Sequence, residues 1–139
     1  MRVAINGFGR IGRIFFRSVF DHPNIEVVAV NDIASSDIMI HLLKYDSVHG
    51  IFNASVSRQE NKILIDDLEV VYFSEENPAD LPWGDLNVDV VLESTGLFRT
   101  VDLLESHLRS GAKKVILSAT PTTDSIPTVV LGVNDSILT

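Results

Sequence analysis

The 139-residue sequence contains no cysteine, so disulfides, thiolate metal sites and a cysteine nucleophile are excluded within these residues. Basic residues are few, because 11 lysines and arginines stand against 19 aspartates and glutamates, and the formal net charge is −8. This charge argues against nucleic acid or an anionic membrane as the main partner. It does not exclude a phosphorylated ligand, because main-chain amides can bind phosphate.

Long apolar runs are also missing, and none approaches the length of a membrane span. The first two residues lead into a short strand rather than a secretory core, so we expect a cytoplasmic protein. No pattern predicts a metal site or any of the common hydrolase motifs. With 139 residues and 45% hydrophobic content, the sequence predicts one domain over residues 1–139 with a core of its own.

A glycine-rich motif opens the chain. An apolar strand candidate at residues 2–6 runs into Gly7, Gly9 and Gly12, which have the spacing Gly-x-Gly-x-x-Gly. In dinucleotide-binding proteins the first glycine allows the tight turn, the second lets the backbone approach a pyrophosphate, and the third lets helix and strand pack closely. The alternative is a helix start that needs small residues only for packing.

A helical repeat follows the motif. Apolar residues recur at spacings of three and four, which predicts an amphipathic helix with these residues on its packed face. They are Ile11, Ile14, Phe15 and Val19. A strand followed at once by this helix is the context that the glycine motif requires.

Asp32 strengthens the dinucleotide interpretation. It ends a second apolar strand candidate at residues 25–30 and lies about twenty residues after Gly12, where an acidic side chain binds the adenosine ribose. A carboxylate there would repel a 2′-phosphate, and residues 33–37 hold no Arg or Lys to neutralise one, so NAD is favoured over NADP. The alternative is that Asp32 is only a turn residue or helix cap before Ile38.

The remaining pattern predicts an α/β fold. Strands that alternate with helices indicate a Rossmann-type, doubly wound, mostly parallel sheet with right-handed crossovers. A small antiparallel strand insertion is expected around residues 54–73. The expected elements are a helix at 36–45, a loop at 46–53, strands at 54–58, 62–65, 68–73 and 88–92, a helix at 100–110, and strands at 113–117 and 128–131.

Small or polar residues end four of the expected strands, at residues 6–9, 31–32, 93–96 and 118–121. Ligands of open parallel sheets bind at the carboxyl ends of the strands. Turns use the same residue types, so for the last two segments a turn and a ligand contact both remain open.

Six segments together resemble a known family, in order along essentially the whole chain. They are residues 5–13, 30–32, 42–50, 93–98, 111–115 and 132–134. In these segments the sequence resembles glyceraldehyde-3-phosphate dehydrogenase. The resemblance implies an NAD-binding domain from an enzyme that oxidises a small phosphorylated aldehyde with inorganic phosphate. It also implies a homotetramer for the full-length protein.

The resemblance also implies site residues. The backbone of Arg10 and Ile11 would bind the pyrophosphate. Thr95, Gly96 and Phe98 would line the adenine and ribose side of the cleft.

At two further predicted site positions the sequence departs from the family's, either at the residue itself or just after it. Glu76 stands where the family commonly has a basic residue near the adenine, so a backbone contact would remain without the positive charge. Ser118 would lie near the nicotinamide. Thr120 separates Ala119 from Pro121, whereas the family usually has Ala-Pro directly, so the sequence departs from the family's at the nicotinamide end.

Catalytic residues are not expected within this chain. The family's cysteine nucleophile lies beyond the segment that resembles residues 132–134, and the four histidines read as surface or packing residues. We therefore expect a cofactor-binding fragment that does not catalyse the reaction. Erythrose-4-phosphate dehydrogenase is the alternative within the enzyme class, and a non-enzymatic NAD-binding module is the alternative outside it.

Overall fold

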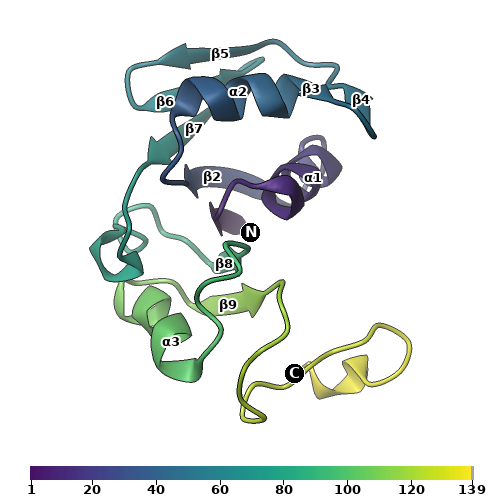
Figure 1. Cartoon of the computed structure of the whole chain (residues 1–139), viewed down its shortest axis with the longest axis vertical. Helices are drawn as coiled ribbons and strands as arrows, with labels where there is room; N and C mark the ends of the chain where they lie inside the picture. The colour runs from purple at the N-terminus through teal and green to yellow at the C-terminus, as the bar shows by residue number, and fades with distance from the viewer. Residues whose placement is uncertain (139) are drawn as a thin grey trace.

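The computed structural model describes residues 1–138 and contains a seven-stranded sheet in the order β5-β6-β7-β2-β1-β8-β9 (Figure 1). The strands β7, β2, β1, β8 and β9 pair in parallel, whereas β5 and β6 are antiparallel additions at one edge. The strand bounds are β1 Arg2–Asn6, β2 Glu26–Asn31, β5 Val56–Gln59, β6 Lys62–Ile65, β7 Leu68–Phe73, β8 Val90–Glu93 and β9 Lys114–Leu117.

Three α-helices occur within the described residues: α1 Arg10–Val19, α2 Ser36–Lys44 and α3 Val101–Arg109. Single 3₁₀ turns lie at Pro78–Asp80 and Asp135–Ile137. Ser35 caps α2 by accepting a hydrogen bond from the amide of Ile38, the usual role of serine before a helix. No helix in residues 1–138 has the length and apolar character needed to cross a bilayer.

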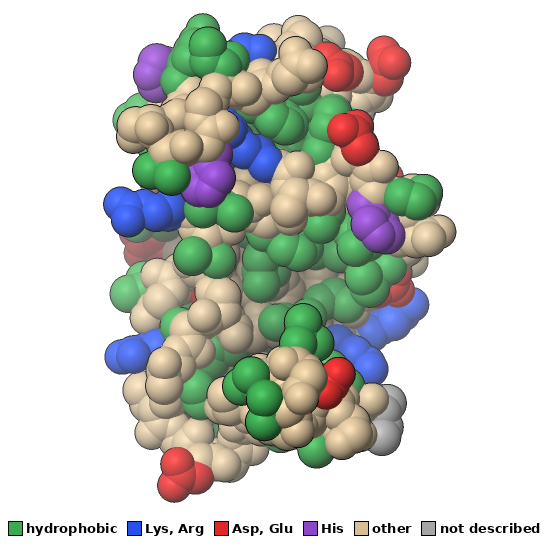
Figure 2. Space-filling view, turned by 90° about the vertical axis from the view of Figure 1, so that its right-hand side faces the viewer, with side chains coloured by type: hydrophobic (Ala, Val, Ile, Leu, Met, Phe, Trp, Pro, Cys, Tyr) green, Lys and Arg blue, Asp and Glu red, His purple; other side chains and the backbone are tan. Residues whose placement is uncertain are grey.

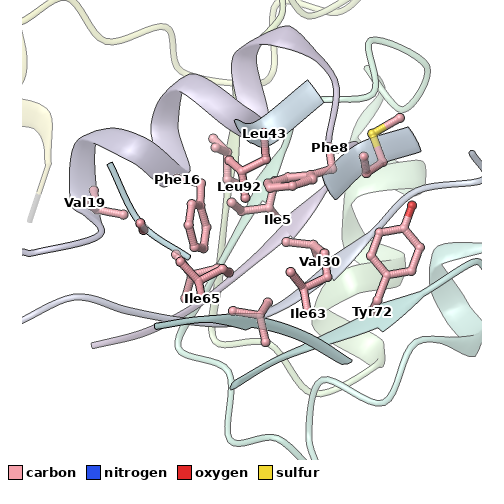
Figure 3. Close-up of a cluster of buried hydrophobic side chains, with 14 residues drawn as sticks. Ile5, Phe8, Phe16, Val19, Val30, Leu43, Ile63, Ile65, Tyr72 and Leu92 are labelled. Atoms are coloured by element: carbon pink, nitrogen blue, oxygen red, sulfur yellow. The ribbon is translucent and has the colours of Figure 1, made fainter. Parts of the chain in front are cut away.

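The sheet is buried on both faces, because neighbouring residues of a strand point in opposite directions. Ile5 and Val30 lie in one apolar cluster with Phe16 of α1 and Leu43 of α2 (Figure 3). Ala4 and Ala29 lie in a second cluster, which is filled by Leu81, Trp83 and Val88. The near-continuous apolar strands β1, β2 and β8 are typical of a parallel sheet covered on both sides.

The strand order places a switch point between β1 and β8. From β1 the chain winds through β2 to β7 on one side and then crosses to β8 and β9 on the other. A crevice forms outside the carboxyl ends of the strands where the winding reverses. The predicted Rossmann-type α/β fold is therefore confirmed.

Two predicted elements are wrong. The loop expected at 46–53 contains a small antiparallel hairpin of β3 Tyr45–Asp46 and β4 Gly50–Ile51. Asp46 Oδ1 accepts the amides of Val48 and His49, both at 2.8 Å, and these bonds hold the turn. The strand expected at 128–131 is absent from the described chain, because the segment is exposed and has no neighbouring strand to pair with.

Two smaller differences concern the packed face of α1 and the strands that pair with β7. Ile11 was expected on the packed face of its helix but is 52% exposed, and the buried positions of α1 are Gly12, Phe16 and Val19. Val19 is buried as predicted and Phe15 is partly buried against the core, whereas the fully buried aromatic residue of the helix is Phe16. The strand at 68–73 was expected in an antiparallel group, but β7 also pairs in parallel with β2 and so joins the insertion to the main sheet.

Candidate functional site

A cavity of about 490 Å³ opens at the switch point. Its walls come from the ends of β1, β2 and β8 and from the chain that follows β7. The lining residues are Asn6, Gly7, Gly9, Asn31, Asp32, Ile33, Glu75, Glu76, Ser94, Thr95, Leu97 and Phe98. Six of them were predicted as site residues: Gly7, Gly9, Asp32, Glu76, Thr95 and Phe98.

The three glycines of the motif have different surroundings. Gly7 has φ +91°, and a Cβ there would lie 2.5 Å from the amide nitrogen of Thr95. A Cβ on Gly12 would lie 2.4 Å from the carbonyl oxygen of Gly7, so helix and turn meet in backbone contact. A Cβ on Gly9 would meet no atom within 4 Å. Gly7 and Gly12 are thus required by the fold, whereas Gly9 borders open space.

Helix α1 begins beside this space without a side-chain cap. Gly9 is its N-cap, and the first turn carries no acidic residue. Arg10 and Ile11 are exposed there. The first amides of a helix have no partner within the helix, and the helix dipole makes this end positive. The arrangement can bind an anion that approaches over Gly9.

Arg13 supports the same turn from within. Its Nη1 donates to the carbonyl of Phe8 at 2.9 Å. Burial lowers the pKa of this guanidinium, and the nearby carboxylates of Asp46 and Asp32 oppose that shift. Arg13 therefore adds positive charge behind the turn.

Asp32 is fixed by the backbone. Its Oδ2 accepts the amide of Phe8 at 2.8 Å, and its Oδ1 accepts the amide of Ala34 at 2.9 Å. Each carboxylate oxygen can accept a further bond, so the group can still bind hydroxyls in the cavity. Asp32 is thus also a turn residue, as the alternative supposed. It is not a helix cap, because Ser35 caps α2.

Tyr72 holds the loop that follows Asp32. Its hydroxyl donates to the carbonyl of Ala34 at 2.7 Å and lies 3.4 Å from that of Asp32. Burial, with a smaller effect from the Asp32 carboxylate, raises the pKa of Tyr72 above the ordinary tyrosine value. The hydroxyl therefore stays protonated and keeps donating.

The opposite wall is the turn after β8. The amide and the hydroxyl of Thr95 both donate to Glu93 Oε1, at 2.9 and 2.5 Å. Gly96 has φ +76°, which glycine adopts without strain. Leu97, which follows β8, and Ile33, which follows β2, both line the cavity and are 71% and 68% exposed. Two apolar side chains thus flank the opening.

The remaining predicted residues lie in different places. Glu76 lines the cavity and is exposed. Ser118 follows β9, donates its amide to the carbonyl of Glu93 at 3.0 Å and does not line the cavity. The prediction missed six lining residues: Asn6, Asn31, Ile33, Glu75, Ser94 and Leu97. Asn6 and Asn31 carried a signal, because both end a strand that leads to the site.

Comparisons with known proteins agree with this geometry. The family model described as glyceraldehyde 3-phosphate dehydrogenase, NAD binding domain, matches residues 1–101. Glyceraldehyde-3-phosphate dehydrogenase of Mycoplasma pneumoniae is 51% identical over 138 residues, which cover 99% of this chain and 41% of that protein. The Thermotoga maritima protein of the same name is 50% identical, again over 99% of this chain and 41% of its own length.

A third relative gives the same result. Glyceraldehyde-3-phosphate dehydrogenase of Geobacillus stearothermophilus is 48% identical over 96% of this chain and 40% of its own length. The chain thus spans about two fifths of the length of these relatives. On the family match over its first 101 residues, the chain belongs to the glyceraldehyde-3-phosphate dehydrogenase family, as its NAD-binding domain.

Proposed function

We propose that NAD lies in the cavity at the switch point, with its pyrophosphate over Gly9. The observation that carries this proposal is the open space above Gly9 at an uncapped helix start. The backbone amides of Arg10 and Ile11 would bind the phosphates, with Gly7 and Gly12 shaping the turn beneath them. The whole stretch 1–139 would act as one cofactor-binding unit.

The adenosine half of NAD would occupy the same cavity. Asp32 would accept hydrogen bonds from the ribose hydroxyls, since each of its oxygens keeps a free acceptor position. The adenine would lie between the Glu76 wall and the turn of Thr95, Gly96 and Phe98. Ser118 would approach the nicotinamide. The fixed carboxylate of Asp32 disfavours a 2′-phosphate and supports NAD over NADP.

We further propose that the full-length protein is a phosphorylating glyceraldehyde-3-phosphate dehydrogenase. Its substrates would be a small phosphorylated aldehyde, inorganic phosphate and NAD, and it would act as a homotetramer in the cytoplasm. Formation of a thiohemiacetal needs a thiolate, and these 139 residues contain no cysteine. They would therefore bind and orient the cofactor without catalysing the reaction.

Titration calorimetry with NAD and NADP tests the site through Asp32→Asn. The wild-type chain should bind NAD and discriminate against NADP. Hydrogen bonds to a charged group contribute about 1.5–3 kcal/mol, so the substitution should weaken NAD binding by roughly 10- to 100-fold. It should also narrow the difference between the dissociation constants for NAD and NADP.

Asp37→Asn is the matched control. Asp37 is a carboxylate at the start of α2 with a side chain 71% exposed, and it does not line the cavity. This variant should bind NAD as the wild type does. Equal NAD affinity of the Asp32 and Asp37 variants would refute the assignment of Asp32 to the ribose.

A further inference from the structure

Three polar residues form a row at the floor of the cavity. Asn31 of β2, Asn6 of β1 and Glu93 of β8 are direct partners across neighbouring parallel strands. Their exposed fractions are 4%, 1% and 0%. We call these three residues the polar ladder. Buried polar side chains in a parallel sheet are unusual and need partners, so the ladder's bonds are informative.

The bonds of the ladder run in one direction. Asn31 Nδ2 donates to Asn6 Oδ1 at 2.7 Å, and Asn6 Nδ2 donates to Glu93 Oε2 at 2.6 Å. Asn6 uses its nitrogen toward Glu93 and its oxygen toward Asn31, and Asn31 turns its nitrogen toward Asn6. The acceptor-only carboxylate at the end therefore fixes the orientation of both amides.

His107 also donates to Glu93, and the indole of Trp83 fixes which ring nitrogen does so. The indole of Trp83 donates to His107 Nδ1 at 2.9 Å. Since indole is only a donor, Nδ1 is an acceptor and the proton of the neutral ring lies on Nε2. That nitrogen lies 2.9 Å from Glu93 Oε2 and donates to it. With Asn6 and with the amide and hydroxyl of Thr95, Glu93 accepts four bonds, about the full capacity of a carboxylate.

The ladder contacts both walls of the cavity. At one end Glu93 holds the amide and the hydroxyl of Thr95. At the other end, Asn31 Oδ1 accepts the amide of Glu75 at 2.8 Å and Asn31 Nδ2 donates to the carbonyl of Glu75 at 3.0 Å. Glu75 follows β7 and Thr95 follows β8, two strands that β2 and β1 separate in the sheet, and both residues line the cavity. One continuous set of side-chain bonds thus joins the two walls.

We propose that Glu93 is a positioning residue for the cofactor, which couples the Thr95 wall to the Glu75 wall through Asn6 and Asn31. This inference rests on the proposed NAD site and deepens it. Glu93 lies beneath the cavity and does not line it, so its effect on the cofactor passes through the residues that it orients. Its negative charge is used to accept converging donors.

The test is Glu93→Gln. A glutamine side chain has nearly the same shape, but its NH₂ group must face either the Thr95 amide or the pair formed by Asn6 and His107. A donor then meets a donor, and the amides along the ladder lose their fixed orientation. The NAD dissociation constant should rise about tenfold. In the free protein, hydrogen exchange should speed up about tenfold at the amides of Thr95 and Glu75.

Ile65→Ala is the matched control for stability. Ile65 is 1% exposed, pairs with Leu68 at the start of β7 and lies away from the carboxyl ends of the strands. Both variants are measured well below their melting temperatures. The control should melt earlier and keep the wild-type NAD affinity and the wild-type exchange rate at Glu75. If Glu93→Gln lowered the melting temperature but left the NAD dissociation constant and the exchange at Glu75 unchanged, the proposal would be overturned.

A second pair of variants decides the matter if Glu93→Gln does not fold. His107→Gln keeps one donor for Glu93 and one acceptor for Trp83, whereas His107→Leu removes both. The leucine variant should bind NAD more weakly and exchange the Glu75 amide faster than the glutamine variant. Equal dissociation constants and equal exchange rates in the two variants would overturn the proposal. A wild-type chain that does not bind NAD would refute the proposed site, whereas unchanged exchange at Glu75 would refute the ladder alone.

Discussion

The two ends of the predicted cofactor site are built in different ways. At the adenine end, Asp32 and Thr95 lie on short turns: the Asp32 carboxylate accepts the amides of Phe8 and Ala34, and Thr95 donates to Glu93 at the buried end of β8. At the nicotinamide end, Ser118 begins a segment in which no residue from 118 to 138 is buried. Leu131 and Val133, 82% and 78% exposed, belong to this segment. The segment extends away from the sheet (Figure 1), and Figure 2 shows hydrophobic side chains on the surface at the lower end of the molecule.

The contrast shows where pre-organisation comes from. The adenine end is fixed by the sheet itself, because the parallel strands β1, β2 and β8 end together and their last side chains bond to one another. The nicotinamide end follows β9, an edge strand with exposed and half-buried residues in alternation. We therefore expect substitutions at the adenine end to have large effects on NAD binding, and substitutions after β9 to have small ones.

Gly7→Ala should have the largest effect and destroy the adenine end together with the fold. The residue has φ +91°, and the new Cβ would lie 2.5 Å from the backbone nitrogen of Thr95, which cannot move alone. Strain and steric overlap should together lower the free energy of unfolding by about 3 kcal/mol or more. Urea unfolding followed by circular dichroism measures the loss.

Gly9→Ala separates turn strain from cofactor contact. A Cβ at Gly9 meets no atom within 4 Å, so the free energy of unfolding should change by less than about 1 kcal/mol. NAD affinity should still fall, because the methyl group would occupy the space proposed for the pyrophosphate. If Gly7→Ala were as stable as Gly9→Ala, the close approach of the first turn to Thr95 would be contradicted.

Sequence reasoning worked best where a residue type has one physical use. Three glycines in fixed spacing and an acidic residue at the end of the next strand predicted the turn, the helix and the position of Asp32. The alternation of strands and helices predicted the fold class. Residues 62–65 and 68–73 were placed with the observed bounds because polar turns interrupt apolar runs there.

The sequence was less informative where burial decides. Glu93 and His107 are polar residues that a sequence places on the surface, yet both are fully buried because they satisfy each other. The segment 128–131 is apolar enough for a strand, but pairing depends on a neighbour that a local pattern does not reveal. The hairpin β3–β4 depends on the side chain of Asp46, which accepts two backbone amides.

Those two bonds, the His49 amide first, lower the pKa of Asp46 to about 2. Because the folded value lies below the ordinary 3.8, the stabilisation from this group is present above about pH 4. It is lost as the pH falls toward 2.

Tyr72→Phe should have an intermediate effect on the adenine end, and one that depends on pH. The folded pKa is raised above the ordinary value of 10.0, so the stabilisation is complete below pH 10 and is lost as the pH rises beyond it. The phenylalanine variant should be less stable by about 1 kcal/mol at pH 7, because the bond to Ala34 is missing. Between pH 10 and 11 it should lose stability less steeply than the wild type.

Tyr45→Phe is the control for that measurement. Tyr45 is 51% exposed, and the only other tyrosine of the chain is Tyr72. Urea unfolding at pH 7 and pH 11 should show the wild-type pH dependence for the Tyr45 variant. The loop after Asp32 would not depend on the Tyr72 hydroxyl if both variants reduced the alkaline loss of unfolding free energy, between pH 7 and pH 11, by the same amount.

Ser118→Ala should have the smallest effect and so measures the nicotinamide end directly. Ser118 is held to the body of the fold by a backbone amide bond to the carbonyl of Glu93, which alanine keeps. Loss of one exposed hydroxyl contact corresponds to about 0.5 kcal/mol, or a two- to threefold weaker NAD affinity. Calorimetry beside Asp32→Asn gives the comparison on one scale. A loss as large as that of the Asp32 variant would mean that the chain after β9 is as firmly placed around NAD as the adenine end, which would contradict the difference drawn between the two ends.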